Sequence, residues 1–199
     1  RYGVRLRAAI RACVALSRQP DAIVANSHAG AAYHRTLGYR TDRWIVIDNG
    51  VDTVRFCPNP EARRRMRAAL DAPEDRLLLA HVARVDPMKD HAGFIAALDR
   101  LPDVVAIVVG QGTEALPARP NLRRLGRRLD MPDVLAAADI IVSSSAYGEG
   151  FSTALSEGMS AGLIPVATDV GDARRIIGDT GEIAAPRDPE ALAQAISRI

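Results

Sequence analysis

Two glutamates flank a glycine-bearing loop and the start of an expected helix in SSSAYGEGFSTALSEGM, residues 143–159. We expect a strand to end at the serines and a helix to begin near Ser152. Unpaired backbone amides at the start of a helix, here those of Phe151, Ser152 and Thr153, bind anions such as phosphate. Gly150 allows the chain to approach a ligand closely. The segment therefore predicts an anion site.

The two glutamates, Glu149 in the loop and Glu157 on the helix, suggest what surrounds the anion. Glu157 lies one turn after Thr153, on the same helix face. A carboxylate accepts two O–H donors at once, so both glutamates suit pairs of hydroxyls better than phosphate. Hydroxyl pairs on both sides of a phosphate cluster are typical of a nucleoside-diphosphate sugar. The alternative is an acid that stabilises the helix dipole, together with a surface glutamate, because this spacing also arises by chance.

Two cations, Arg84 and Lys89, follow the apolar run LLLAHV, at the edge of an α/β sheet where ligands bind. They could clamp a diphosphate and offset the charge that grows as it leaves. The alternative is a surface pairing of these cations with Asp86 or Asp90. Spacing alone favours neither interpretation.

A glycine pair, Gly110 and Gly112, follows the run VVAIVV and fits the loose dinucleotide fingerprint, with Asp130 about twenty residues further on. Pro117 would interrupt the helix that should hold a pyrophosphate. The fingerprint also belongs to the first βα turn of a domain, and this pair follows a middle strand. We therefore favour a tight turn and keep NAD or FAD binding as the minor alternative.

The composition excludes several other classes of function. The four histidines lack metal-ligand spacing, and no DxD, GxSxG or P-loop motif occurs. The net charge is +2 and aromatic residues make up 4%, which argues against nucleic acid as a partner. We expect His81 to be a hydrogen-bonded core residue. We expect Cys13 and Cys57 to be free thiols in a reducing cytosol.

Short apolar runs alternate with helical patterns along the chain. Most runs are apolar without alternation, as in parallel strands covered on both faces. We expect strands at residues 22–25, 44–47, 77–82, 104–109, 140–143 and 163–167. We expect helices near residues 1–16, 28–37, 61–70, 91–101, 132–137, 153–161, 173–177 and 189–196. This order predicts an α/β fold with a Rossmann-like parallel sheet and helices on both of its faces.

Turn residues are dense in DNGVDTVRFCPNP, residues 48–60. The part before this stretch is too short for a complete α/β domain, whereas the part after it is a self-sufficient run of βα units. We therefore place a domain boundary near residue 50. Residues 1–50 are interpreted as the remnant of an N-terminal domain with the interdomain segment, and residues 51–199 as a ligand-binding domain.

In chain order, these features resemble retaining glycosyltransferase family 4, often called group 1, of the GT-B fold. Each motif alone is weak, but the ordered set is specific and spans nearly the whole chain. The stretch from Glu149 to Glu157 matches the E-x7-E motif of the family. The other matching positions are 23–27, 49–52, Phe56, Pro58, Arg84, Lys89, Gly110, Gly112, 125–126, 130–132, 136–139, Gly162, 165–166 and 168–171.

The resemblance implies roles for the candidate residues. Arg84 and Lys89 would grip the donor diphosphate and act through leaving-group electrostatics, and Glu149 would hold hydroxyls of the donor sugar. Glu157 would hold the ribose. The remaining residues implied at the donor site are Gly110, Gly150, Phe151, Ser152 and Thr153. In this family a donor phosphate oxygen helps to deprotonate the acceptor, so we expect no metal and no cofactor.

The same resemblance implies a donor linked to UDP or GDP, and a glycan or lipid-linked acceptor, as in polysaccharide biosynthesis. The chain would be the donor-binding half, expected to be inactive without the missing acceptor domain. We expect a cytoplasmic location, with peripheral contact at the inner membrane face through the arginine-rich first helix. The alternatives are a nucleotide-sugar epimerase of the same fold and a non-catalytic nucleotide-sugar-binding module.

Two positions depart from the family pattern. Gly158 stands where alanine is common, and Asp172 stands where glycine is frequent. Both are expected to be details of a helix or a loop that leave the roles of the site residues intact.

Overall fold

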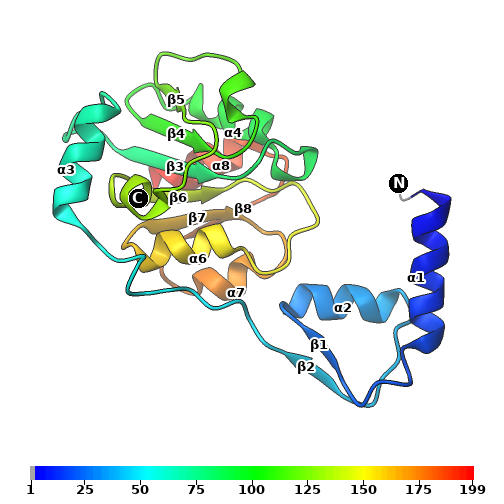
Figure 1. The fold of residues 1–199 in the computed structure, drawn as a ribbon. Helices are drawn as coiled ribbons and strands as arrows, with labels where there is room; N and C mark the ends of the chain where they lie inside the picture. The colour runs from blue at the N-terminus through cyan, green and yellow to red at the C-terminus, as the bar shows by residue number, and fades with distance from the viewer. Residues whose placement is uncertain (1–2) are drawn as a thin grey trace.

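The computed structural model describes residues 3–199 as two parallel sheets joined by a turn-rich segment (Figure 1). The smaller sheet pairs β1 (Ile23–Ala25) with β2 (Trp44–Val46). Its strands are flanked by α1 (Val4–Leu16) and α2 (His28–Thr36). The hydroxyl of Ser27 caps α2 by accepting from the amide of Gly30 at 3.0 Å, which explains why this helix begins at the serine.

The larger sheet has six strands in the order β5-β4-β3-β6-β7-β8, and every neighbouring pair is parallel. Its central strands are almost entirely buried, which accounts for their unbroken apolar sequences. The strands are β3 (Leu78–Val82), β4 (Val105–Val109), β5 (Leu122–Arg124), β6 (Ile140–Ser143), β7 (Ile164–Thr168) and β8 (Glu182–Ala184).

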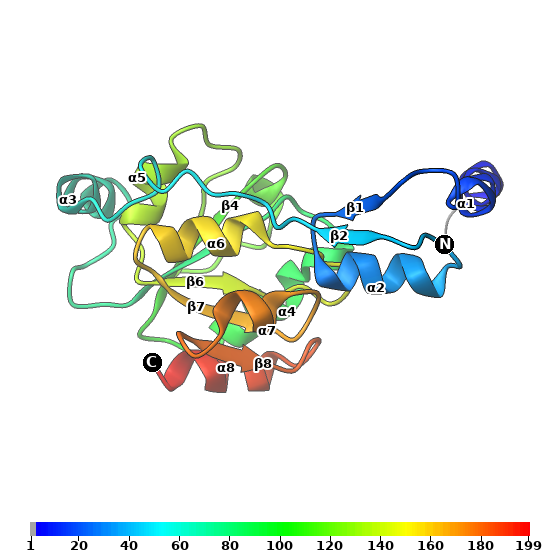
Figure 2. The same ribbon diagram turned by 90° about the horizontal axis from the view of Figure 1, so that it is seen from below.

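Helices cover both faces of the larger sheet, as Figure 2 shows. One hydrophobic cluster contains residues from α3 (Pro60–Ala69), α5 (Met131–Ala136), α6 (Thr153–Ser160) and α7 (Ala173–Ile177). The other contains residues from α4 (His91–Leu98) and α8 (Pro189–Ser197). The predicted α/β fold, with a parallel sheet between two helical layers, is confirmed.

The sequence missed the two edge strands, β5 and β8. Each has only three residues, and charged side chains interrupt both, with Arg123 and Arg124 in β5 and Glu182 in β8. Charged residues on short edge strands oppose pairing with further strands. The same charges remove the apolar run that identified the inner strands.

The departure at Gly158 has a packing explanation. Gly158 is buried in α6 and faces Ile141 of β6, and a Cβ added there would lie 2.6 Å from the Cβ of Ile141. The helix therefore approaches the sheet more closely than an alanine would allow.

We predict that Gly158→Ala destabilises the chain by about 1–3 kcal/mol, because overpacking outweighs the better helix propensity of alanine. Urea unfolding of the parent and the variant measures this free energy. Gln194→Ala, on the exposed side of α8, is the control and should stay within about 0.5 kcal/mol of the parent. A Gly158→Ala variant as stable as the parent would contradict the close packing.

Candidate functional site

The loops that follow β3, β4, β6 and β7 meet at one edge of the larger sheet, because the strands are parallel. Backbone hydrogen bonds connect these loops directly. The amide of Val85 donates to Gln111 at 2.8 Å, and the amide of Ala146 donates to Met88 at 2.8 Å. The residues predicted from separate motifs are thereby brought to one edge.

Lys89 and Glu149 form an ion pair at this edge, between the Nζ atom and Oε1. The hydroxyl of Ser145 donates to the same carboxylate oxygen at 2.7 Å. The Lys89 side chain is 20% exposed and that of Glu149 is 11% exposed, so the pair is shielded yet reachable from solvent. The structure therefore brings together a cation and a carboxylate that are sixty residues apart in the sequence.

The backbone around Lys89 is held firmly. Lys89 ends a short 3-10 turn, Pro87–Lys89. The turn begins at a proline, whose fixed φ already has the value that the turn requires. The Asp86 carboxylate accepts from the amide of Met88 at 2.9 Å, and this bond is the main cause of the lowered pKa of Asp86. The hydroxyl of Ser144 donates to the carbonyl of Lys89 at 2.8 Å.

His81 supports this arrangement from below. Its Nε2 atom lies 2.8 Å from Ser144 Oγ, and since that hydroxyl donates to the Lys89 carbonyl, His81 is the donor to the hydroxyl. Burial, followed by the charges of His91 and Lys89, lowers the pKa of His81 to about 3. His81 is 2% exposed and neutral at physiological pH, which confirms its predicted place in the core, but only Nε2 is hydrogen-bonded and the buried Nδ1 atom has no partner within residues 3–199.

Arg84 lies on the same loop as Lys89 but points elsewhere. Its side chain is 62% exposed, and its guanidinium lies 3.3 Å from the Asp86 carboxylate. Among residues 3–199, no hydrogen bond or ion pair joins Arg84 to Lys89 or Glu149. This geometry matches the alternative surface pairing, and a role for Arg84 in ligand binding stays a prediction.

The start of α6 lies beside Lys89. Lys89, Ser145 and Ser152 line the same small hollow at the sheet edge. No side chain caps α6, and in the described part of the chain the amides of Phe151, Ser152 and Thr153 donate no hydrogen bond. Free amides at a helix start, next to an ammonium group, have the properties that anion binding requires, and the binding of an anion here stays a prediction.

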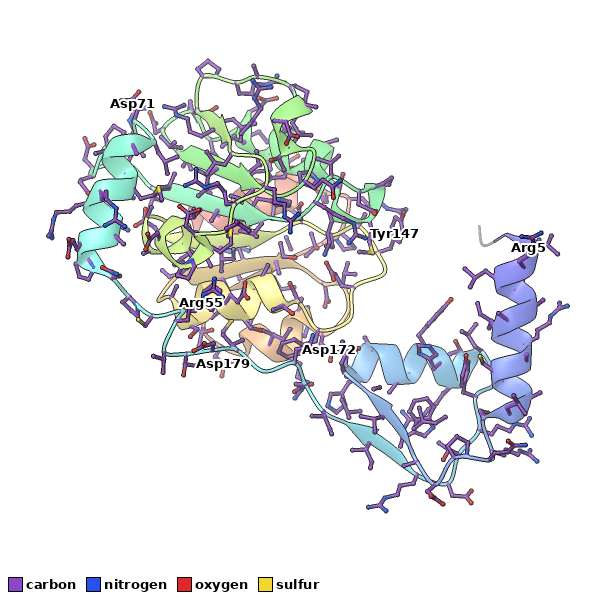
Figure 3. All side chains as sticks on the ribbon, in the orientation of Figure 1. Arg5, Arg55, Asp71, Tyr147, Asp172 and Asp179 are labelled. Atoms are coloured by element: carbon purple, nitrogen blue, oxygen red, sulfur yellow. The ribbon has the colours of Figure 1, made fainter. Side chains whose placement is uncertain are left out.

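Glu157 lies one turn along α6, partly buried and facing a different neighbour. Burial raises the pKa of Glu157 above its ordinary value of 4.5, and the positive charge of Arg55 opposes this shift. Arg55 comes from the turn-rich segment, which passes beside α6 (Figure 3). The charged neighbour of Glu157 is therefore Arg55, whereas that of Glu149 is Lys89.

The glycine pair has a structural role. Gly110 has a φ of +143°, and a Cβ there would lie 2.2 Å from the carbonyl oxygen of Ala83. Because Gly110 has no Cβ atom, the loop after β4 can pack against the loop that carries Arg84. A 3-10 turn, Thr113–Ala115, follows instead of the longer helix that the dinucleotide fingerprint requires. The tight turn is confirmed, and the geometry does not support NAD or FAD binding.

Several residues that shape this edge were not singled out as part of a site. Ser144 and Ser145 belong to the serine run that seemed only to end a strand. Arg55 lies in a segment whose composition signals turns. Asp172, noted as a departure, lies in the loop after β7, and its amide donates to the carbonyl of Gly150 at 3.1 Å. For Ser144 and Ser145, the one signal in the sequence was their position at the end of an expected parallel strand, where ligand sites lie in α/β sheets.

Three further observations concern the whole of residues 3–199. No three or more His, Cys, Asp or Glu side chains gather there in a way that could hold a metal ion. None of the helices in this range combines the length and the apolar character needed to cross a bilayer. Cys13 and Cys57 are exposed free thiols, as expected.

The raised pKa of Glu157 predicts a pH-dependent effect of Glu157→Gln. The folded state holds the proton more tightly than the unfolded state, so ionisation above pH 4.5 destabilises the folded chain. The gain in unfolding free energy from Glu157→Gln should therefore be larger at pH 7 than at pH 4. Urea unfolding at the two pH values measures it, with Glu190→Gln on the exposed side of α8 as control. An equal effect of Glu157→Gln at both pH values would contradict the burial of this carboxylate.

Known proteins resemble this chain over most of its length. The family model described as glycosyl transferases group 1 matches residues 76–199. The chain is 30% identical, over 89% of its length, to D-inositol 3-phosphate glycosyltransferase 2 of Catenulispora acidiphila, of which the match covers 47%. It is 32% identical, over 76% of its length, to phosphatidyl-myo-inositol mannosyltransferase of Mycolicibacterium smegmatis, of which the match covers 42%. The chain thus spans about half the length of these relatives.

A solved structure gives the same picture of the fold. The structure of Anabaena Alr3699/HepE in complex with UDP and glucose superposes with a TM-score of 0.87 at 26% identity. The superposition covers 96% of this chain and 57% of that chain. The family match over residues 76–199 includes Lys89, Glu149, Glu157 and the start of α6. The chain therefore belongs to the glycosyl transferases group 1 family.

Proposed function

We propose that this chain is the nucleotide-sugar-binding part of a glycosyltransferase and that Lys89, Glu149, Glu157 and the start of α6 form its donor site. The observation that carries the proposal is the Lys89–Glu149 pair beside an uncapped helix start. The complex of the Anabaena protein with UDP and glucose supports a donor of this class.

Lys89 and the α6 amides suit the diphosphate. Each is a hydrogen-bond donor, each carries positive charge or partial charge, and the Lys89 side chain is only 20% exposed. When the bond between sugar and phosphate breaks, negative charge grows on the departing diphosphate. Donors already in place stabilise that charge without the cost of reorganisation. Arg84 could join them at small cost, because its exposed pairing with Asp86 contributes little.

The two glutamates suit the hydroxyl groups on either side. Ser145 and Lys89 fix Glu149 at one carboxylate oxygen, Oε1, and the second oxygen can accept from a hydroxyl of the donor sugar. The Glu157 carboxylate accepts no hydrogen bond within residues 3–199, so it is open to the hydroxyls of a ribose. Hydroxyl donors would offset the cost of keeping this partly buried carboxylate charged.

The finer features of the reaction belong to this proposal as well. We propose transfer with retention from a UDP- or GDP-linked sugar to a glycan or lipid-linked acceptor, with no metal ion. Lys89 and the helix start would supply the positive charge at the diphosphate. Since the chain spans about half of its relatives, transfer itself is proposed for the whole protein, with an acceptor-binding part completing the site.

Nucleotide binding tests the proposal. We expect at least one of UDP, UDP-glucose, GDP and GDP-mannose to bind the chain and raise its melting temperature. Lys89→Met and Glu157→Gln should each weaken binding by about tenfold or more, because the first removes a charged hydrogen-bond donor and the second replaces a charged acceptor with a neutral one. Isothermal titration calorimetry measures both affinities.

Arg100→Met, at the end of α4 and on the opposite helical layer, is the matched control for Lys89→Met because it removes one positive charge elsewhere. It should change the affinity by less than about twofold. The absence of binding by any of these nucleotides, or binding by Lys89→Met as tight as that of the parent, would refute the donor site.

A further inference from the structure

Asp172, in the loop after β7 of the larger sheet, contacts α2, the helix beside the smaller sheet. Its carboxylate accepts two short hydrogen bonds from the start of α2, from the amides of His28 and Ala29, both at 2.7 Å. The side chain is 4% exposed, and its partners are more than 140 residues away in the sequence. Figure 3 labels Asp172 beside the first residues of α2.

These contacts complete the cap of α2. The Ser27 hydroxyl accepts from the amide of Gly30, and the Asp172 carboxylate accepts from the amides of His28 and Ala29. A carboxylate that accepts from amides at a helix start is also favoured by the helix dipole. The cap of a helix in the first part of the chain is therefore supplied by a residue in the last part.

Asp172 is also hydrogen-bonded to the loop after β6, which carries Glu149. The Asp172 amide donates to the carbonyl of Gly150 at 3.1 Å. The preceding residue, Gly171, has a φ of +65°, and a Cβ there would lie 2.6 Å from the Glu149 carbonyl oxygen. A Cβ on Gly150 would in turn lie 2.8 Å from Ser27 Oγ. Ser27, Gly150 and Asp172 thus form a close three-way junction directly beside Glu149.

A second set of contacts crosses the same junction. Arg175, one turn after Asp172, pairs with Asp48 in the segment that follows β2. Its Nε atom also lies 4.0 Å from the Asp172 carboxylate. Asn49 donates to the hydroxyl of Thr153, at the start of α6, at 3.4 Å. The contact at Asp172 is therefore part of a surface that both regions share.

We propose that Asp172 is a positioning residue that couples the placement of α2 to the placement of Glu149. Through its carboxylate it holds the start of α2, and through its amide it holds the loop in which Glu149 meets Lys89. A glycine at this position could keep the second contact but not the first. The link to donor binding rests on the function proposed above, whereas the coupling between α2 and the loop does not.

The chain offers a direct reporter for this coupling, because Lys89 is its only lysine. In a ¹⁵N-labelled sample, the single lysine ammonium signal reports on the Lys89–Glu149 contact. Hydrogen exchange of the His28 and Ala29 amides reports on the contact of Asp172 with α2. The ratio of the affinities for UDP-glucose and UDP isolates the part of binding that Glu149 would contribute.

The experiment compares the parent with Asp172→Asn, Asp172→Gly and the control Asp179→Asn. Asp179 is exposed and lies outside the junction, as its label in Figure 3 shows. In both Asp172 variants we expect the His28 and Ala29 amides to exchange about tenfold faster or more, because they lose a charged acceptor. We expect the Lys89 signal to shift. UDP-glucose should bind about tenfold more weakly, while UDP changes by less than about twofold.

Each other outcome is decisive. If His28 and Ala29 exchange as in the parent, the contact does not hold α2 and the proposal is wrong. If exchange accelerates but the Lys89 signal and the affinity ratio match the parent, Asp172 caps α2 alone and the coupling is refuted. If the parent binds no nucleotide, the proposed function fails. The exchange and lysine measurements then still decide the coupling between α2 and the loop.

Discussion

Six parallel strands impose one constraint on which the site depends, because all of their carboxyl ends face the same edge of the sheet. Three of the inner strands end in loops that carry one component each: a cation after β3, a tight glycine turn after β4 and an acid after β6. Hydrogen bonds between these loops then fix their relative positions. The parallel topology therefore brings these side chains together, and no single motif would do so alone.

The sequence was most informative where burial dictated residue type. The inner strands and the helices that cover them follow from apolar runs and from helical periodicity, and the structure confirms both. The edge strands β5 and β8 escaped because short strands at an edge carry charges and bury little. The boundaries of helices differed by a few residues, as at the C-terminal end of α4, which ends at Leu98.

The candidate site could be predicted in its components but not in its pairings. Motif order identified Lys89 and Glu149, yet nothing in the sequence shows that they contact each other across sixty residues. Spacing likewise left open whether Arg84 faces a ligand or Asp86, and in this structure it faces Asp86. Contacts such as those of Asp172 with α2 depend on how two distant regions meet, which local patterns do not encode.

The support beneath Lys89 has a consequence for recognition. Because His81 and Ser144 anchor its carbonyl, the main chain at Lys89 is already fixed, and only the aliphatic stem can swing. At the proposed donor site, a diphosphate that bound the ammonium group would therefore restrict only a few side-chain torsions of Lys89, which limits the entropy lost on binding. The neutral imidazole of His81, buried in the protein interior, thereby helps to fix the position of the Lys89–Glu149 ion pair at the edge of the sheet.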